Sequence, residues 1–171
     1  FNIPGLEVIP AVGEEKPHPE LDPGGLVDVL AAAKAREVYE KNPDALVIGA
    51  DTVVACSGEV LGKPRDVQDA RRMLKMLSNR AHEVLTGVTI MSPIGGARGV
   101  EKTLVHFRWL SGREIDAYIA SGEPMDKAGA YGIQGLASLF VDRIEGDYFN
   151  VVGLPLCLLG EMMKDLGVEL L

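Results

Sequence analysis

The chain has 171 residues, of which 47% are hydrophobic and 25% are charged, and its formal net charge is -8. This length suits one hydrophobic core, so we expect a single domain over residues 1–171. The acidic balance argues against binding to DNA or RNA, which usually requires a basic face, but it allows a small anion held by a few lysines beside a divalent metal. No apolar run approaches the roughly 20 residues of a membrane helix, and no secretory signal pattern opens the chain.

The use of cysteine points to a reducing compartment. Cys56 and Cys157 lie far apart, and neither belongs to a CxxC or Cys/His set. We therefore expect reduced thiols and a cytoplasmic location. Because no membrane-helix or signal pattern is visible, we also expect no membrane partner.

The first part of the chain predicts a loop, a helix and a buried strand. Residues 13–25 are polar and broken by prolines, which predicts the loop. A helix follows until Asn42 and Pro43 stop it, because the apolar residues share one face; they are Leu26, Val29, Leu30 and Ala33. "ALVIGA" (45–50) predicts a strand buried on both faces, with Asp51 at its end.

The remaining segments alternate between strands and helices. "CSGEV" predicts a hairpin turn that leads to "LGKP" (61–64), and Asp66 can cap a helix whose apolar face is Ala70, Met73, Leu74 and Leu77. Two longer strands are expected at about 83–91 and 102–110, and "SGRE" (111–114) is a capping-box pattern that opens a short helix. The last helix has a face for core packing, formed by Leu158, Leu159, Met162, Met163 and Leu166. The class is α/β with a central mixed sheet.

Asp51 is the first candidate for chemistry. An aspartate after a strand is often a turn or cap residue, since its side chain bonds readily to nearby backbone. However, catalytic groups of α/β proteins gather at the carboxyl ends of strands. A half-buried carboxylate there can hold a divalent cation or accept a proton from an attacking water.

Lysines and a glycine-rich block supply the other candidates. Lys63 follows the hairpin and can fold back towards Asp51, where it would neutralise phosphate oxygens, although a lone lysine is more often solvated. The block "GEPMDKAGAYGIQG" (122–135) has little side-chain bulk, so we expect it to face a ligand and to contribute little to the core. Within the block, Gln134 carries a donor and an acceptor that could pair with the O4 and N3–H edge of uracil or thymine. A structured loop with routine polar contacts is the alternative.

Other polar residues give weaker signals. Glu14 and Glu15 could add a carboxylate to a metal site, or simply lie in a solvated acidic loop. His18, His82 and His106 have no metal-ligand spacing and are expected to be structural. No Walker loop, GxGxxG or Ser/His/Asp arrangement is present, so the sequence does not support nucleophilic catalysis or dinucleotide binding.

Five motifs together resemble the Maf family of nucleoside triphosphate pyrophosphatases: "VIGADTVV", "GEVLGKP", "LTGV" (85–88), "SGEPMDKAGAYGIQG" and "GDYFNVVGLPL" (146–156). The resemblance covers nearly the whole chain in the right order. It is greatest to the branch that cleaves dTTP and UTP, and smaller to the branch that acts on 7-methyl-GTP. It implies a mixed sheet flanked by helices in two lobes, a cleft between the lobes, and in many members a homodimer.

The resemblance also implies roles for particular residues. Asp51 would be the proton acceptor and a metal ligand, with Glu15 as an accessory acidic ligand of Mg²⁺ or Mn²⁺. Lys63 and Lys127 would contact the phosphates. Thr52 would help to select the base, and Gln134 would set the preference for pyrimidines.

The chain departs from the family pattern at its start, because members begin with a strand and a phosphate-binding "SxSPRR" stretch that is expected before Phe1. The resemblance still implies hydrolysis of dTTP, UTP or modified forms to the monophosphate and pyrophosphate. The alternative is a catalytically weak, nucleotide-binding regulator of cell division.

Overall fold

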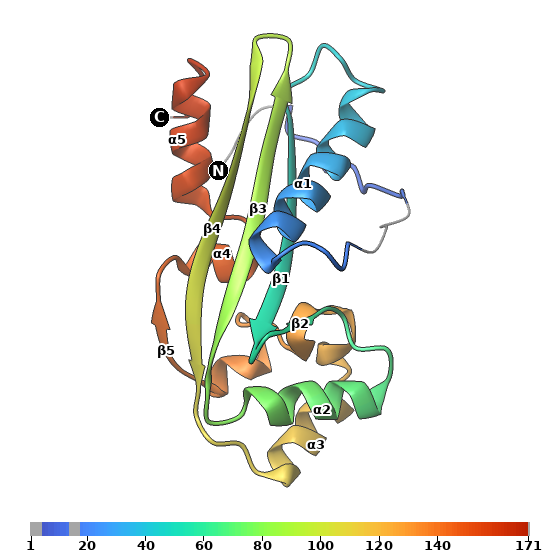
Figure 1. Cartoon of the computed structure of the whole chain (residues 1–171), viewed down its shortest axis with the longest axis vertical. Coiled ribbons are helices and arrows are strands. Elements are labelled where there is room, and N and C mark those ends of the chain that lie inside the picture. Colours follow the sequence, from blue (N-terminus) through green and yellow to red (C-terminus); the bar gives the residue numbers. More distant parts are fainter. Residues whose placement is uncertain (1–4, 14–17, 171) are drawn as a thin grey trace.

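The computed structural model describes residues 5–13 and 18–170, and Figure 1 shows a twisted sheet with helices on both faces. Five strands lie in the order β2-β1-β3-β4-β5, with bounds β1 (Val47–Cys56), β2 (Glu59–Leu61), β3 (Ala81–Ser92), β4 (Gly95–Phe107) and β5 (Val141–Glu145). The α-helices are α1 (Pro23–Tyr39), α2 (Val67–Leu77), α3 (Gly112–Ala120), α4 (Tyr148–Val152) and α5 (Leu156–Asp165). Short 3₁₀ segments are η1 (Glu123–Asp126), η2 (Ala128–Ala130) and η3 (Leu136–Leu139).

The predicted α/β class is confirmed, but the sheet is not mixed in the described part of the chain. All four strand pairings there are antiparallel. The reason lies in the connection from β1 to β3, which passes through β2 and α2. This connection brings the chain back to the end of the sheet at which β1 finishes, and β3 begins there. β3 therefore runs back alongside β1.

β1 is longer than the predicted strand, and Asp51 lies in its middle instead of at its end. Pairing with β3 runs without interruption from Val47 to Ala55, and Asp51 lies opposite Gly87. The β-branched residues after Asp51 extend the strand, as their preference for pleated structure predicts. β2 pairs only with the last residues of β1, from 54 to 56, so the first part of β1 has one neighbouring strand among the described residues.

α1 rests on the sheet at two glycines. A Cβ atom at Gly49 on β1 would lie 2.6 Å from the carbonyl oxygen of Ala31, and one at Gly87 on β3 would lie 2.3 Å from that of Val27. Helix backbone therefore approaches strand backbone directly. The helix face predicted from sequence is only partly right, since the residues buried on α1 are Val27, Leu30, Ala31, Ala32 and Ala35.

The turn and cap signals in the sequence are confirmed. Ser57 and Gly58 form the hairpin turn between β1 and β2, and both have positive φ, as a two-residue turn of this type requires. Asp66 accepts a hydrogen bond from the Asp69 N–H at the start of α2, and Ser111 with Glu114 forms the capping box of α3. β4 begins at Gly95, earlier than predicted.

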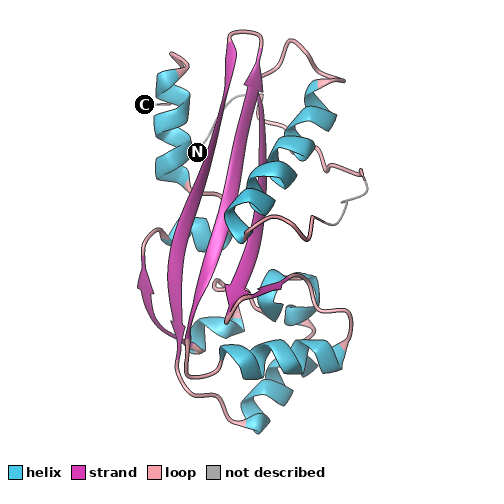
Figure 2. Ribbon diagram, in the orientation of Figure 1, coloured by secondary structure: helices cyan, strands magenta, loops and turns pink. Residues whose placement is uncertain are grey.

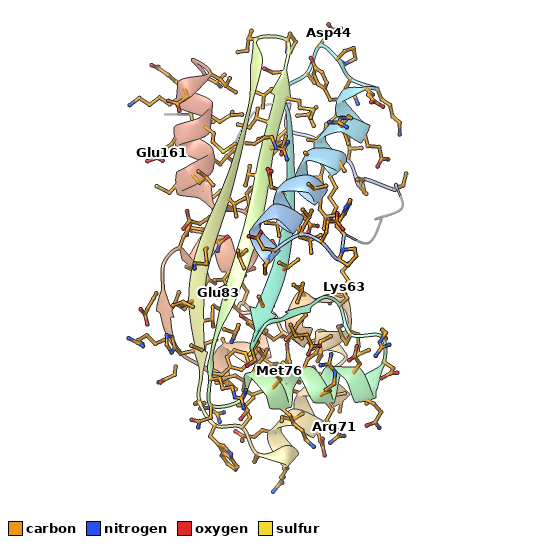
Figure 3. The ribbon with its side chains drawn as sticks, in the orientation of Figure 1. Asp44, Lys63, Arg71, Met76, Glu83 and Glu161 are labelled. Carbon is orange, nitrogen blue, oxygen red and sulfur yellow. The ribbon has the colours of Figure 1, made fainter. Side chains whose placement is uncertain are left out.

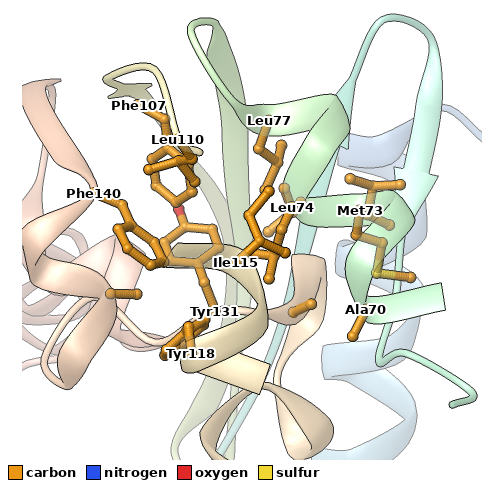
Figure 4. Packing of buried hydrophobic residues seen from close by; sticks show 14 of the residues in the cluster. Ala70, Met73, Leu74, Leu77, Phe107, Leu110, Ile115, Tyr118, Tyr131 and Phe140 are labelled. Atoms are coloured by element: carbon orange, nitrogen blue, oxygen red, sulfur yellow. The ribbon is translucent and has the colours of Figure 1, made fainter. Parts of the chain in front are cut away.

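The helices fall into two groups, which Figure 2 shows above and below one another along the sheet. In the upper group, α1 covers one face and α5 packs on the other, where Leu159, Met162 and Met163 join Val88 and Ile90. In the lower group, α2, α3 and the 3₁₀ segments enclose an aromatic cluster that includes Phe107, Tyr118, Tyr131 and Phe140 (Figure 4). No helix among the described residues has the length and apolar content needed to cross a membrane.

We predict that Gly87→Ala lowers the free energy of unfolding by about 1 to 3 kcal/mol, because the added methyl group would force α1 away from β3. The matched control is Gly112→Ala, where a Cβ atom meets nothing within 4 Å. Urea denaturation should show a clear loss for the first variant and a change within about 0.5 kcal/mol for the second. Equal stabilities of the two variants would contradict the direct backbone contact.

Candidate active site

Five of the residues selected from the sequence line one cavity of about 660 Å³: Asp51, Thr52, Lys63, Lys127 and Gln134. We call it the Gln134 cavity. A second cavity, of about 1150 Å³, shares Asp51, Thr52 and Lys63 with the first and adds Lys34, so we call it the Lys34 cavity. The predicted residues are therefore gathered in one region, although they come from three separate segments. Glu15, the sixth, lies outside the described residues.

Asp51 faces α1 and forms an ion pair with the Lys34 ammonium group. The Asp51 side chain is 12% exposed and the Lys34 side chain 32%. Charges this far withdrawn from water attract one another more strongly than a fully solvated pair. The pair places an acidic group and a cation together where the two cavities meet.

The loop that carries Lys63 is tied to the glycine-rich block. The Gly129 N–H donates to the carbonyl oxygen of Gly62, at 3.1 Å. Gly129 has a φ of +68°, and a Cβ atom there would lie 2.9 Å from the nearest Val54 side-chain atom. A side chain at position 129 would therefore clash with β1 and strain the backbone of the block. Figure 3 shows the position of Lys63, between α1 and the lower group of helices.

Lys63 and Lys127 act on the same carboxylate. The Lys127 ammonium donates to Asp126 at 2.7 Å, and this bond is the main reason why the pKa of Asp126 lies below its usual value. The charge of Lys63 lowers the same pKa further. Two ammonium groups thus lie on the rim of the Gln134 cavity, and both act on Asp126.

Gln134 is held in place by contacts on both sides of it in sequence. The Gly132 N–H donates to the Tyr118 hydroxyl at 3.3 Å, and that hydroxyl donates to Glu123 at 2.9 Å. The other carboxylate oxygen of Glu123 accepts from the Leu136 N–H at 3.0 Å. The side chains of Tyr118 and Glu123 therefore fix the turn from which the exposed Gln134 projects.

The glycine-rich block contributes more to the core than its composition predicted. Ala130, Tyr131 and Ile133 are at most 7% exposed and belong to the lower hydrophobic cluster. The prediction failed because it weighed the small residues of the block and overlooked the two large apolar ones. The block faces a cavity with its polar residues and the core with these.

Three further residues of the site were not predicted from the sequence: Lys34, Glu123 and Tyr118. For Lys34 a signal was available, because it lies three residues after Ala31 and four after Leu30, both of which face the sheet. A lysine on the sheet-facing side of a helix indicates a buried partner. For Glu123 and Tyr118 no comparable signal exists, since their contacts depend on how α3 and the block fold against one another.

Among residues 5–13 and 18–170, no group of three or more His, Cys, Asp or Glu side chains is placed to hold a metal ion. Asp51 is the carboxylate that lines both cavities, while Glu123 lines the Gln134 cavity and Asp22 and Glu83 line the Lys34 cavity. Both cysteines are free, Cys56 buried and Cys157 exposed.

His82 supports the wall of the Gln134 cavity from behind. Its Nε2 atom lies 2.8 Å from the hydroxyl of Tyr131, which lines that cavity. Burial, together with the nearby charge of His106, lowers the pKa of His82 to about 4. The ring is therefore neutral at pH 7 and acts as a structural residue, as the sequence predicted.

An acidic residue, three lysines and an amide around adjoining cavities define a site suited to a polyanionic ligand with a polar ring.

Comparison with known proteins identifies the family. The Maf-like protein family model matches residues 2–166, so the chain belongs to the Maf family. It is 55% identical over 154 residues to a dTTP/UTP pyrophosphatase of Geobacillus sp. (strain WCH70), an alignment that covers 90% of this chain and 83% of the relative. It is 52% identical over 158 residues to a dTTP/UTP pyrophosphatase of Moorella thermoacetica (91% and 81% covered), and 48% identical over 155 residues to one of Bacillus pumilus (91% and 82% covered).

We predict that His82 makes the fold less stable in mild acid. The unfolded chain gains a proton on this residue below pH 6.5, whereas the folded chain does not until pH 4, so stability falls as the pH drops through that window. Between pH 7.5 and 5.5 the free energy of unfolding should fall by about 1 kcal/mol more in the wild type than in His82→Gln. Urea denaturation at both pH values measures the difference. His18→Gln, a change at a partly exposed histidine, is the control, and equal pH dependence in His82→Gln and wild type would contradict the assignment.

Proposed function

We propose that the chain hydrolyses the bond between the α and β phosphates of pyrimidine nucleoside triphosphates, dTTP, UTP and their modified forms, to the monophosphate and pyrophosphate. One observation carries the proposal. Asp51, Lys63, Lys127 and Gln134 surround one cavity in a chain about half identical to proteins named dTTP/UTP pyrophosphatases. The acidic, cationic and amide groups match the three parts of such a reaction: an attacking water, a polyphosphate and a base.

In the proposed reaction, Asp51 accepts a proton from the attacking water. The water oxygen bonds to the α-phosphorus, the bond from that phosphorus to the bridging oxygen breaks, and pyrophosphate leaves with the electron pair. The ion pair with Lys34 orients the Asp51 carboxylate. Lys63 and Lys127 offset the charge that builds on the leaving pyrophosphate, since positioning and charge stabilisation dominate phosphoryl transfer.

The base would lie in the Gln134 cavity. This cavity has apolar walls from Val54, Val84 and Val152 as well as the exposed amide of Gln134. Apolar walls accommodate the faces of a ring, while the amide can bond its polar edge. Thr52 lines the same cavity from β1.

A divalent cation fits this site as part of the substrate. Mg²⁺ keeps several waters and binds through one or two carboxylates together with substrate phosphates. The carboxylate of Asp51 meets that need, with Glu15 as the proposed second ligand. When bound, Mg²⁺ or Mn²⁺ would neutralise phosphate charge and polarise the phosphorus–oxygen bonds. A cytoplasmic location, inferred from the use of cysteine, and assembly into a homodimer, implied by the family resemblance, complete the proposal.

Asp51→Asn tests the role of the carboxylate. We predict a loss of pyrophosphate release from UTP of roughly 10²- to 10⁴-fold, because an amide cannot accept the proton. The variant should keep its fold with only a modest fall in melting temperature, because the amide has the shape of the carboxylate but lacks the charge that pairs with Lys34. Asp116→Asn, a change at a half-exposed aspartate paired with Arg71, is the control and should retain activity.

Two outcomes of this experiment would contradict the proposal. Release of orthophosphate would indicate a different phosphatase mechanism. The second outcome is binding without turnover: calorimetry shows that the wild type binds UTP, but UTP stays intact over hours with Mg²⁺ or Mn²⁺. This result would favour the alternative, a nucleotide-binding regulator of cell division.

Lys63→Gln tests the phosphate site. We predict that KM for UTP rises roughly tenfold or more, since a charge-assisted contact to phosphate is lost. Affinity for UMP should change much less, because the ammonium group would face the departing pyrophosphate. Lys102→Gln, at an exposed lysine paired with Glu83, is the control. An equal loss of affinity for UMP and UTP would place Lys63 away from the leaving group.

A further inference from the structure

A chain of buried hydroxyl and carbonyl groups begins at Thr52, on the wall of the Gln134 cavity. The Thr52 Oγ1 atom lies 2.8 Å from the Oγ1 atom of Thr86 on β3. The Thr86 hydroxyl in turn lies 3.0 Å from the backbone carbonyl oxygen of Asn150 on α4 and donates to it. Thr86 and Asn150 are both 0% exposed, so water does not compete for these bonds.

The far end of this chain is rigid. The Asn150 side-chain nitrogen donates to the Val84 carbonyl oxygen at 3.0 Å and to Thr103 Oγ1 at 2.9 Å. Thr103 is also 0% exposed, and its hydroxyl donates to the carbonyl oxygen of Asp147 at 3.0 Å. α4 is thus attached to both β3 and β4, and the Asn150 carbonyl that receives the Thr86 proton has a fixed position.

The direction of each proton follows from the number of protons available. A hydroxyl has one proton and a carbonyl oxygen has none. Because the Thr86 proton lies on the carbonyl of Asn150, Thr86 can only accept from Thr52. The Thr52 proton therefore points at Thr86, and only its lone pairs remain for a ligand. If Thr86 donated to Thr52 instead, its oxygen would face the buried carbonyl oxygen of Asn150 with no proton between them.

We infer that Thr86 and Asn150 are positioning residues that make Thr52 a fixed hydrogen-bond acceptor in the Gln134 cavity, and so select uracil and thymine over cytosine. The inference rests on the proposed function, since it concerns the base of the bound nucleotide. The N3 atom of uracil and thymine carries a proton, which Thr52 can accept. The N3 atom of cytosine carries a lone pair, which would meet the lone pairs of Thr52.

Gln134 alone does not explain this selection. Its side chain is exposed, and no hydrogen bond among the described residues fixes its amide. An amide that rotates by half a turn exchanges its donor and its acceptor. It can therefore bond either the O4 atom of uracil and thymine or the N4 amino group of cytosine, which leaves the N3 atom to Thr52. Discrimination requires this second group, whose polarity does not change.

The test is the ratio of kcat/KM for UTP to that for CTP, measured for the wild type, Thr86→Val and Thr86→Ser. In Thr86→Val the Thr52 hydroxyl has lost its acceptor, so it can turn and donate to the N3 atom of cytosine. We expect the ratio to fall roughly five- to tenfold, with higher activity on CTP as part of the change. Thr86→Ser keeps a hydroxyl and should keep the ratio within about twofold. A purely structural role would lower both activities together and leave the ratio unchanged.

Thr89→Val is the matched control. Thr89 lies on the same strand and is 1% exposed, and its Oγ1 atom has no partner in the part of the chain that the structure describes. The substitution makes the same chemical change without touching the chain of bonds, so the ratio should not move. If Thr86→Val fails to fold by near-UV circular dichroism, Thr52→Val removes the acceptor for the N3 proton itself. The ratio should then fall through a loss of activity on UTP with no gain on CTP, and an unchanged ratio would overturn the inference.

The outcomes separate this inference from the proposed function. A wild type that cleaves UTP while Thr86→Val keeps its preference for UTP over CTP would overturn the inference alone. A wild type that cleaves neither nucleotide would overturn the proposed function. In that case calorimetric binding of UMP and CMP measures the same discrimination without turnover. A preference for UMP that Thr86→Val loses would support a fixed acceptor, and equal binding of both by the wild type would refute it.

Discussion

The direct contact between the backbone of α1 and the backbones of β1 and β3 determines the geometry of the site. It exists because positions 49 and 87 are glycines, so that strand and helix approach without intervening side chains. At this separation Lys34 lies against Asp51, and the ion pair is formed where water has limited access. Any side chain at either glycine would push the helix outwards by the width of a methyl group or more. The charged centre of the site is therefore a consequence of tight packing between a helix and a sheet.

The glycine-rich block uses its missing side chains in a similar way. The space next to Gly132 is occupied by the aliphatic part of Lys127, and the space next to Gly135 by the carboxylate of Glu123. Each glycine thus lets a functional or supporting side chain cross the backbone of its own loop. The positive φ at Gly129 then turns the block so that it meets the loop of Lys63. Small residues here are needed for the close approach of charged side chains, and the large apolar residues of the same block anchor it in the core.

Local signals in the sequence predicted those parts of the fold that local physics decides. Turn residues, caps and the apolar face of α2 were predicted correctly because each depends on a few neighbouring positions, as at Asp66 and Ser111. The end of β1 was predicted wrongly because an aspartate often ends a strand, whereas here pairing with β3 carries the strand past Asp51. Contacts between distant segments, such as Thr52 with Thr86 or Glu123 with Leu136, have no sequence signal of their own. Their partners are set by strand register and by the fold of the block.

The position of Asp51 within a strand has a consequence that a position at its tip would not have. Successive residues of a strand point to opposite faces of the sheet. Asp51 faces α1 and Lys34, while Thr52 faces β3, α4 and the Gln134 cavity. Both residues nevertheless line the Gln134 cavity and the adjoining Lys34 cavity. A nucleotide that spans the two cavities would have its phosphates beside the ion pair and its base beside the fixed hydroxyl. Adjacent residues on one strand would then serve two different tasks, proton transfer and selection of the base, without competing for the same space.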